Sequence, residues 1–327
     1  MTKTTNNYMK TKTLIVVNPI SGVGRQKRIE VLLKQNLNHD LFDYEVRYTE
    51  RIHHGIEIAR EAADKGYDCV VAVGGDGSVS DVVQGLRGSD TRLGIIPCGS
   101  GNGLAHTLKL PMQPWLAIRA LNHQYELTID SILVSGDECN TTEYVCVCSA
   151  GVGFDAYVSR IMQAAKSRGL AAYTNIVLRA YNSYHESSYT LHLGGRTIKR
   201  KAWIIALQNS NRIGYNMPVS PTARLDDGII DISIIDKVPP DHVAITAPLA
   251  LTNHLQLSQH VEMFRTNEIT IEGNLDKWVD IDGEGINIGR TARFVNNPRS
   301  VKVYGRDPQQ TLIVRTPSGD PITLPRI

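Results

Sequence analysis

The stretch "VVAVGGDGSVSDVVQGL", from Val70 to Leu86, decides the fold. It begins with an apolar, β-branched run of strand length, continues with glycines around an aspartate, and ends in an amphipathic segment. This order predicts a buried strand, a tight turn with little side-chain bulk, and a helix whose N-terminal amides point at the turn. Two interpretations stay open: Asp76 caps the helix in a purely structural turn, or the turn binds an anion.

The same pattern extends on both sides of this stretch. Short apolar runs such as "TLIVVNP", "YEVRYT" and "LGIIPCG" alternate with amphipathic stretches as far as Leu121, which predicts a doubly wound α/β layer. Beyond Asn122, runs such as "EYVCVCSAGVGF" and "GIIDISII" follow one another, which predicts a mainly antiparallel β-sandwich. The expected parts are a disordered lead-in over 1–12, an α/β domain over 13–123, a β-sandwich domain over 124–305 and a tail over 306–327.

Composition narrows the class of protein. The 327 residues suit two domains, and a net charge of +2 leaves no basic excess, so no nucleic-acid partner is expected. The N-terminal stretch "MTKTTNNYMKTKTL" lacks the apolar run of a secretion signal, and no run approaches the roughly 18 apolar residues of a membrane span. The five cysteines form no CxxC pair and are expected to be reduced. We therefore expect a cytoplasmic protein that is at most peripheral at a membrane.

Glycine-rich loops follow three of the predicted strands. They are "NPISGVGR" after the first strand, the GGDG turn after the third, and "CGSGNGL" after the fourth. Because the carboxyl ends of parallel strands meet at one edge of a sheet, these loops should converge on one crevice. A carboxylate among phosphate-binding amides requires a cation such as Mg²⁺ between the two negative charges. The convergence favours a phosphate-binding site, although no P-loop or GxGxxG motif is present.

Several segments together identify a family. "NPISGVGR", "GGDGSVSDVVQGL", "GIIPCGSGNGLAHTLKLP", "SAGVGFDA", "PTARLDDGIIDI" and "DIDGEG" occur in the order seen in the diacylglycerol kinase catalytic-domain family, which the chain resembles from Leu14 to Tyr304. The family includes bacterial soluble lipid kinases and sphingosine and ceramide kinases. The resemblance implies a Rossmann-like nucleotide-binding lobe over 13–123, a lipid-substrate β-sandwich over 124–305, and a nucleotide cleft between them. It also implies transfer of the γ-phosphoryl group of ATP to a lipid hydroxyl, with Mg²⁺.

The resemblance assigns roles to individual residues. Asp76 and Asp130 would organise Mg²⁺, and Glu284 in "DGEG" would be the catalytic base. A carboxylate at a glycine-flanked strand end is a suitable proton acceptor, although an ordinary hairpin turn explains the same residues. In "RLDDGIID", some bacterial members bind a structural Mg²⁺ through what would be Asp227 and the backbone carbonyls of Arg224 and Ile229; Asx-turn chemistry alone also explains this loop. The implied nucleotide contacts are Asn18, Thr49, Gly74, Gly75, Asp76, Gly77, Ser78, Ser100, Gly101 and Asn102.

The identity of the acceptor stays open. The third loop reads GSGNG, which is closer to the GSGNA of sphingosine and ceramide kinases than to the GTGND of many bacterial diacylglycerol kinases. The alternatives are an NAD kinase-like phosphotransferase and a catalytically inactive nucleotide-binding regulator. The expected partners are a lipid substrate and, transiently, a membrane surface, and a homodimer is left open. The apolar segment from His242 to Leu257 is either a docking element or ordinary packing on the sandwich.

Overall fold

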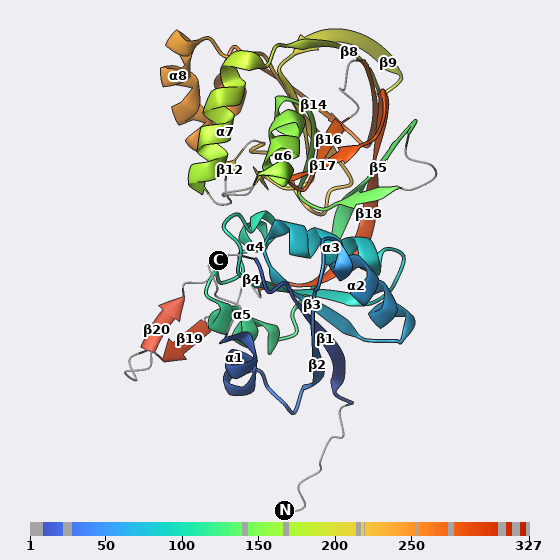
Figure 1. Ribbon diagram of the computed structural model, residues 1–327, viewed down its shortest axis with the longest axis vertical. Helices are drawn as coiled ribbons and strands as arrows, with labels where there is room; N and C mark the ends of the chain where they lie inside the picture. The colour runs from blue at the N-terminus through green and yellow to red at the C-terminus, as the bar shows by residue number, and fades with distance from the viewer. Residues whose placement is uncertain are drawn as a thin grey trace, which may run out of the picture. The chain divides into compact units, whose positions relative to one another are not determined.

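The structure is a computed structural model that divides into two compact units, each described by itself (Figure 1). The first unit comprises Met1–Gly99, Leu108–Leu127 and Lys302–Ile327, and the second comprises Ser100–Thr107 and Thr128–Val301. The domain ranges predicted from the sequence remain predictions. The structure describes residues 9–21, 28–138, 143–165, 170–213, 217–218, 220–252, 254–273, 278–306, 312–315 and 321–324.

The first unit is built on a parallel sheet. Strands β1 (Thr11–Val17), β2 (Phe42–Tyr48), β3 (Cys69–Gly74) and β4 (Arg92–Pro97) pair in the order β2-β1-β3-β4, and every pair is parallel. The last residues of β18 (Thr291–Tyr304) join β4, with Val303 opposite Leu93. The helices are α1 (Ile29–Asn36), α2 (His54–Asp64), α3 (Asp76–Leu86) and α5 (Pro114–Leu121), where α1 packs with α5 and α2 with α3.

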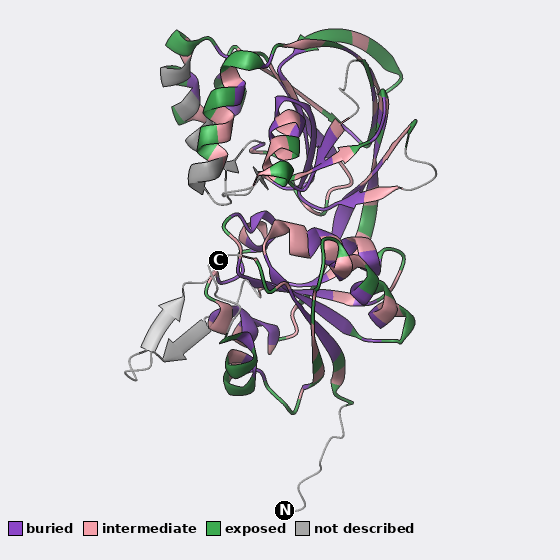
Figure 2. Ribbon diagram, viewed as in Figure 1, coloured by how far each residue is buried: buried purple, intermediate pink, exposed green. Residues whose placement is uncertain are grey.

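The centre of this sheet explains its sequence pattern. Every residue of β3 is buried, because helices or neighbouring strands cover it on all sides, and Figure 2 shows the same for most of β4. A strand buried on both faces reads as a continuous apolar run rather than an alternating one. The doubly wound α/β architecture predicted from the sequence is therefore confirmed. Tyr304, at the end of β18, is part of this core together with Ile15, Val71 and Ile96.

The second unit contains two layers of antiparallel strands. One layer has the order β14-β13-β10-β7-β16-β17, with bounds Val261–Thr266, Ile230–Ile235, Ile204–Gln208, Ser149–Gly153, Trp278–Ile281 and Glu284–Asn287. The other has the order β18-β15-β8-β9, where β15 is Glu268–Gly273, β8 is Ser187–Leu193 and β9 is Arg196–Ala202. Strand β5 (Glu126–Gly136) pairs with β18 and with β6 (Tyr144–Cys146).

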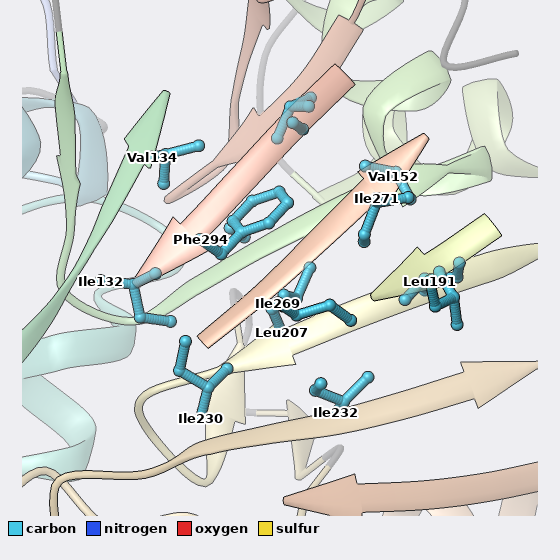
Figure 3. Packing of buried hydrophobic residues seen from close by; sticks show 14 of the residues in the cluster. Ile132, Val134, Val152, Leu191, Leu207, Ile230, Ile232, Ile269, Ile271 and Phe294 are labelled. Carbon is cyan, nitrogen blue, oxygen red and sulfur yellow. The ribbon is translucent and has the colours of Figure 1, made fainter. Parts of the chain in front are cut away.

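Apolar side chains of both layers meet in one core (Figure 3). Phe294 and Ile269 come from one layer, while Leu207 and Ile232 come from the other, and all four are buried. Burial of apolar side chains from two facing sheets is what holds a sandwich together. The predicted β-sandwich is confirmed. The remaining elements of the unit are α4 (Gly103–Thr107), α6 (Phe154–Ala164), α7 (Leu170–Ser183), α8 (Pro240–Leu251), η3 (Leu255–Leu257), β11 (Arg212–Ile213) and β12 (Met217–Pro218).

The predicted lead-in and tail fall largely outside the described residues. Strand β1 already begins at Thr11, inside the range predicted to be a disordered lead-in. In the tail, β19 (Leu312–Arg315) and β20 (Pro321–Leu324) pair as an antiparallel hairpin.

Candidate active site

Strand ends of the first unit bring several predicted residues together. Asn18 follows β1 and donates its backbone N–H to the carbonyl of Val73 on β3, at 3.2 Å. Thr49 follows β2 and donates its backbone N–H to the carbonyl of Val17, at 2.9 Å. These bonds continue the parallel ladder past the strand ends. Asn18, Thr49 and the GGDG turn therefore lie at the same edge of the sheet, as parallel topology requires.

Gly74, the last residue of β3, and Gly75 allow a close approach of backbone. The carbonyl of Gly74 accepts hydrogen bonds from the backbone N–H groups of Cys98, at 2.8 Å, and Gly99, at 3.2 Å. A Cβ on Gly74 would lie 2.2 Å from the hydroxyl oxygen of Ser78, and a Cβ on Gly75 would lie 3.2 Å from the Cα of Gly99. The beginning of the third glycine loop thus lies against the second, with no room for a side chain between them.

Helix α3 begins directly at the aspartate of the turn. Gly75, in extended conformation, is the N-cap residue, and no side chain caps the helix. The interpretation of Asp76 as the N-cap is therefore wrong: Asp76 is the first helical residue. Ser78 accepts a hydrogen bond from the side-chain amide of Asn18, at 3.3 Å. The first and second glycine loops are thereby linked at a helix N-terminus, which favours anionic ligands.

The third-loop residues Ser100, Gly101 and Asn102 belong to the second compact unit, whereas the GGDG turn belongs to the first. Asn102 is buried, has a φ of 57° and accepts the backbone N–H of His106 on its carbonyl, at 3.0 Å. This arrangement starts the short helix α4. A nucleotide contact at these residues remains a prediction.

Asp130 lies on β5 in the second unit and is 1% exposed. Its carboxylate accepts the backbone N–H of Gly228 and that of Arg299, each at 2.7 Å, and its own N–H donates to the carbonyl of Leu225 at 2.6 Å. These bonds hold the loop before β13. A role in organising Mg²⁺ remains a prediction for this residue.

Glu284 stands at the first position of β17, directly after a two-residue turn. Asp282 and Gly283 have φ values of 51° and 89°, the conformation that a tight hairpin between twisted strands requires. Glu284 pairs with Ile281 across the hairpin and is half-buried. The interpretation of this segment as a hairpin turn is thus correct. It does not conflict with a role of Glu284 as catalytic base, because Glu284 lies on the strand after the turn.

The turn beside Glu284 is fixed by the carboxylate of Asp282. This carboxylate is buried and accepts the backbone N–H groups of Val147, Cys148 and Ser149, at 2.9, 2.7 and 3.1 Å. Burial raises the pKa of Asp282, and these amides oppose that increase. Three bonds to one side chain restrict the position of the hairpin, and hence of Glu284.

Two further carboxyls with raised pKa values lie in this part of the sandwich, the buried Asp280 and the half-buried Asp155, and sequence reasoning missed both. Burial raises the pKa of Asp280 to about 7. The hydrogen bond from Ser159 lowers this pKa in part, and the negative charge of Asp282 raises it further. Burial and then the charge of Asp280 raise the pKa of Asp155.

The pKa of Asp280 leads to a test of stability. The folded protein retains a proton at Asp280 that the unfolded chain loses, so the free energy of unfolding should fall as pH rises from about 4 to about 7. In Asp280→Asn this fall should be smaller by on the order of 4 kcal/mol, since the pKa of Asp280 is about 7 in the folded protein and about 4 in the unfolded chain. Urea denaturation across this pH range measures the difference, with the exposed Asp64→Asn as control. An unchanged pH dependence in Asp280→Asn would contradict the assignment.

The loop expected to hold a structural metal contains two ion pairs, and the metal itself remains a prediction. One carboxylate oxygen of Asp227 lies 2.6 Å from a guanidinium nitrogen of Arg265, and the other accepts the backbone N–H of Ile229 at 3.2 Å. Arg224 pairs with Asp226, at 3.1 Å. A guanidinium on the same carboxylate disfavours a divalent cation there, because the two positive charges repel each other. Among the described residues, no group of three or more His, Cys, Asp and Glu side chains is placed to hold a metal ion.

Two known protein families match this chain, one in each half of the sequence. The diacylglycerol kinase catalytic domain matches residues 12–134, and the YegS C-terminal NAD kinase beta sandwich-like domain matches residues 148–305. The chain belongs to the diacylglycerol kinase catalytic-domain family. The resemblance found from the sequence motifs is confirmed, and membership of a kinase family supports phosphotransferase activity.

Individual relatives agree with this family. The chain is 32% identical to a "Probable lipid kinase YegS-like" of Chromohalobacter salexigens over 58% of this chain and 61% of that protein, which is less than two thirds of the relative. It is 27% identical to a protein of the same name from Pseudomonas aeruginosa over 90% of this chain and 94% of that one. It is 24% identical to the diacylglycerol kinase of Bacillus subtilis over 83% of this chain and 88% of that one.

A solved structure shows the same fold. The crystal structure of a diacylglycerol kinase from Bacillus anthracis matches with a TM-score of 0.68 and covers 91% of this chain and 98% of its own. The sequence identity is 18%, so this likeness concerns the fold alone.

Proposed function

We propose that this protein is an ATP-dependent lipid kinase that transfers the γ-phosphoryl group of ATP to the hydroxyl of diacylglycerol or of a sphingoid base or ceramide-like lipid. The observation that carries the proposal is the GGDG turn at the start of α3, where Gly74 and Gly75 let Ser78 and Gly99 approach the backbone directly before the helix N-terminus. Membership of the kinase family supports the reaction class. The lipid acceptor and the requirement for Mg²⁺ are parts of the proposal.

In this proposal the predicted site residues bind phosphate, bind a cation or accept a proton. Asn18, Ser78 and the glycine turn bind the phosphates, with Asn18 held in place by its bond to Ser78. Asp76 is the carboxylate at this turn, suited to a cation that also binds phosphate oxygens. When bound, Mg²⁺ neutralises the charge that develops on the phosphoryl oxygens. Glu284 accepts the proton of the lipid hydroxyl as the new phosphorus–oxygen bond forms and ADP leaves.

A lipid acceptor requires contact with a bilayer or a lipid carrier. In the described part of the chain, no helix has the length and apolar character needed to span a membrane. Within the predicted docking segment lie α8 and η3, where Ile245 and Leu257 are each 67% exposed while Leu255 is buried. Exposed apolar side chains of this kind support docking on a membrane surface, and the docking role is part of this proposal.

The test is transfer of radiolabel from γ-labelled ATP to a panel of acceptors. The panel contains diacylglycerol, sphingosine, ceramide, phosphatidylglycerol and NAD, each offered with and without EDTA. Labelling of one lipid that is abolished by EDTA supports the proposal. Labelling of NAD alone would establish the NAD kinase-like alternative, and ATP binding without any transfer would establish the regulator.

The same assay tests Asp76. We expect Asp76→Asn to lower kcat/KM for Mg–ATP by on the order of 10²-fold, because the amide removes a negative charge that would face the cation. The exposed Asp64→Asn on α2 is the matched control and should retain activity. Wild-type kcat/KM in Asp76→Asn would remove Asp76 from the proposed site.

A further inference from the structure

Two carboxylates of the second unit share one guanidinium. Arg265 on β14 lies 2.6 Å from an oxygen of Asp227 through Nη2, and 3.4 Å from an oxygen of Asp231 through Nε. The side chain of Asp231 is 4% exposed and that of Asp227 20%, whereas that of Arg265 is 49% exposed. Arg265 stands directly opposite Asp231 in the β13–β14 ladder, so strand register sets this pair.

The other carboxylate oxygens also have partners. The second oxygen of Asp231 accepts the hydroxyls of Thr222 and Ser220, the latter at 3.3 Å. The second oxygen of Asp227 accepts the backbone N–H of Ile229, which closes an Asx turn. All oxygens of the two carboxylates are therefore engaged within the protein.

The loop from Arg224 to Ile229 is held at a second point by Asp130. Its carboxylate accepts the N–H of Gly228, and its backbone N–H donates to Leu225. These bonds involve uncharged partners, so they fix the loop without neutralising the charge of Asp227. Partly buried carboxylates need a counter-charge, and Arg265 supplies it.

Arg265 and a divalent cation would compete for the same carboxylate here. Arginine offers several N–H donors in one plane and can bridge two carboxylates, as Arg265 does with Asp227 and Asp231. Mg²⁺ requires near-octahedral oxygen ligation, and on Asp227 it would compete with a positive charge already bound. On Asp227, the positive charge that the family resemblance assigns to a metal is thus supplied by a side chain of β14.

We propose that Arg265 replaces the divalent cation at the loop from Arg224 to Ile229, so that this loop folds without metal. A requirement for Mg²⁺ then belongs to the reaction with ATP and not to the structure of the sandwich. The proposal does not depend on the proposed function, because its test uses neither ATP nor lipid.

The test compares melting temperatures of the nucleotide-free protein with EDTA and with added Mg²⁺. The wild-type melting temperature should be the same in both, and Arg265→Met should lower it by about 5 °C in both. Arg265→Lys should lie between the two, since one ammonium reaches a single carboxylate. The matched control is Arg293→Met, which removes a similarly exposed arginine, 53% exposed, from an ion pair with the exposed Glu268, and should change the melting temperature little.

Two results would overturn the proposal. The first is a wild-type melting temperature that falls in EDTA and recovers with Mg²⁺, with this response lost in Asp227→Asn. The second is an Arg265→Met protein no less stable than Arg293→Met. The EDTA comparison on the wild-type protein decides the question even if Arg265→Met fails to fold.

Discussion

Glu284→Gln is expected to lower the rate of phosphoryl transfer by about 10²–10⁴-fold while ATP binding is retained. Glutamine has nearly the same shape as glutamate but cannot accept a proton. Because Glu284 lies on β17 next to a firmly anchored turn, the substitution should leave the hairpin in place. Steady-state transfer to the lipid acceptor found in the panel measures kcat, and equilibrium titration measures the Kd for ATP.

A matched control separates catalysis from general damage. Glu272→Gln on β15 removes an exposed carboxylate of the same unit and should retain full activity. Full activity of Glu284→Gln would show that another group, or water, accepts the proton.

Asp282→Ala is expected to reduce the free energy of unfolding by about 2–4 kcal/mol. The substitution leaves the N–H groups of Val147, Cys148 and Ser149 without their acceptor and places alanine at a φ of 51°. Removal of a buried charge recovers part of this loss, because burial raises the pKa of Asp282. Urea denaturation followed by tryptophan fluorescence measures the change, since Trp278 lies on the same hairpin.

Asp282→Asn distinguishes the sources of this effect. Asparagine tolerates positive φ, and its amide oxygen can still accept the bonds from Cys148 and Ser149, so the loss should be about half as large. The exposed Asp226→Ala should change stability little. If Asp282→Ala were as stable as the wild-type protein, the anchoring of the hairpin by Asp282 would be refuted.

The architecture could be predicted because it depends on local pattern. Strand β3 is apolar throughout since it is buried on both faces, and the glycines after it are required by contacts with Ser78 and Gly99. The first residue of α3 could not be predicted. An N-cap at Asp76 and an N-cap at Gly75 differ by one residue and by a backbone angle that the sequence does not reveal.

Contacts between distant strands could not be predicted. The pair of Asp227 with Arg265 depends on the register of β13 and β14, and nothing near either residue in the sequence indicates it. The raised pKa of Asp155 is a second case: burial is the larger cause, and the charge of Asp280, far along the chain, adds to it. In both cases the sequence shows only charged residues, and their interaction exists only once the sheet has formed.

The return of β18 to the first unit has a consequence for the order of folding. Val303 pairs with Leu93, and Tyr304 packs in the same core as Ile15 and Val71, although nearly the whole second unit lies between them in sequence. A nascent chain that has passed only residue 123 therefore lacks the strand that completes its first sheet. During synthesis, the edge of β4 that pairs with β18 therefore lacks its partner strand until almost the entire polypeptide has left the ribosome. The sheet of the α/β unit can be completed only then.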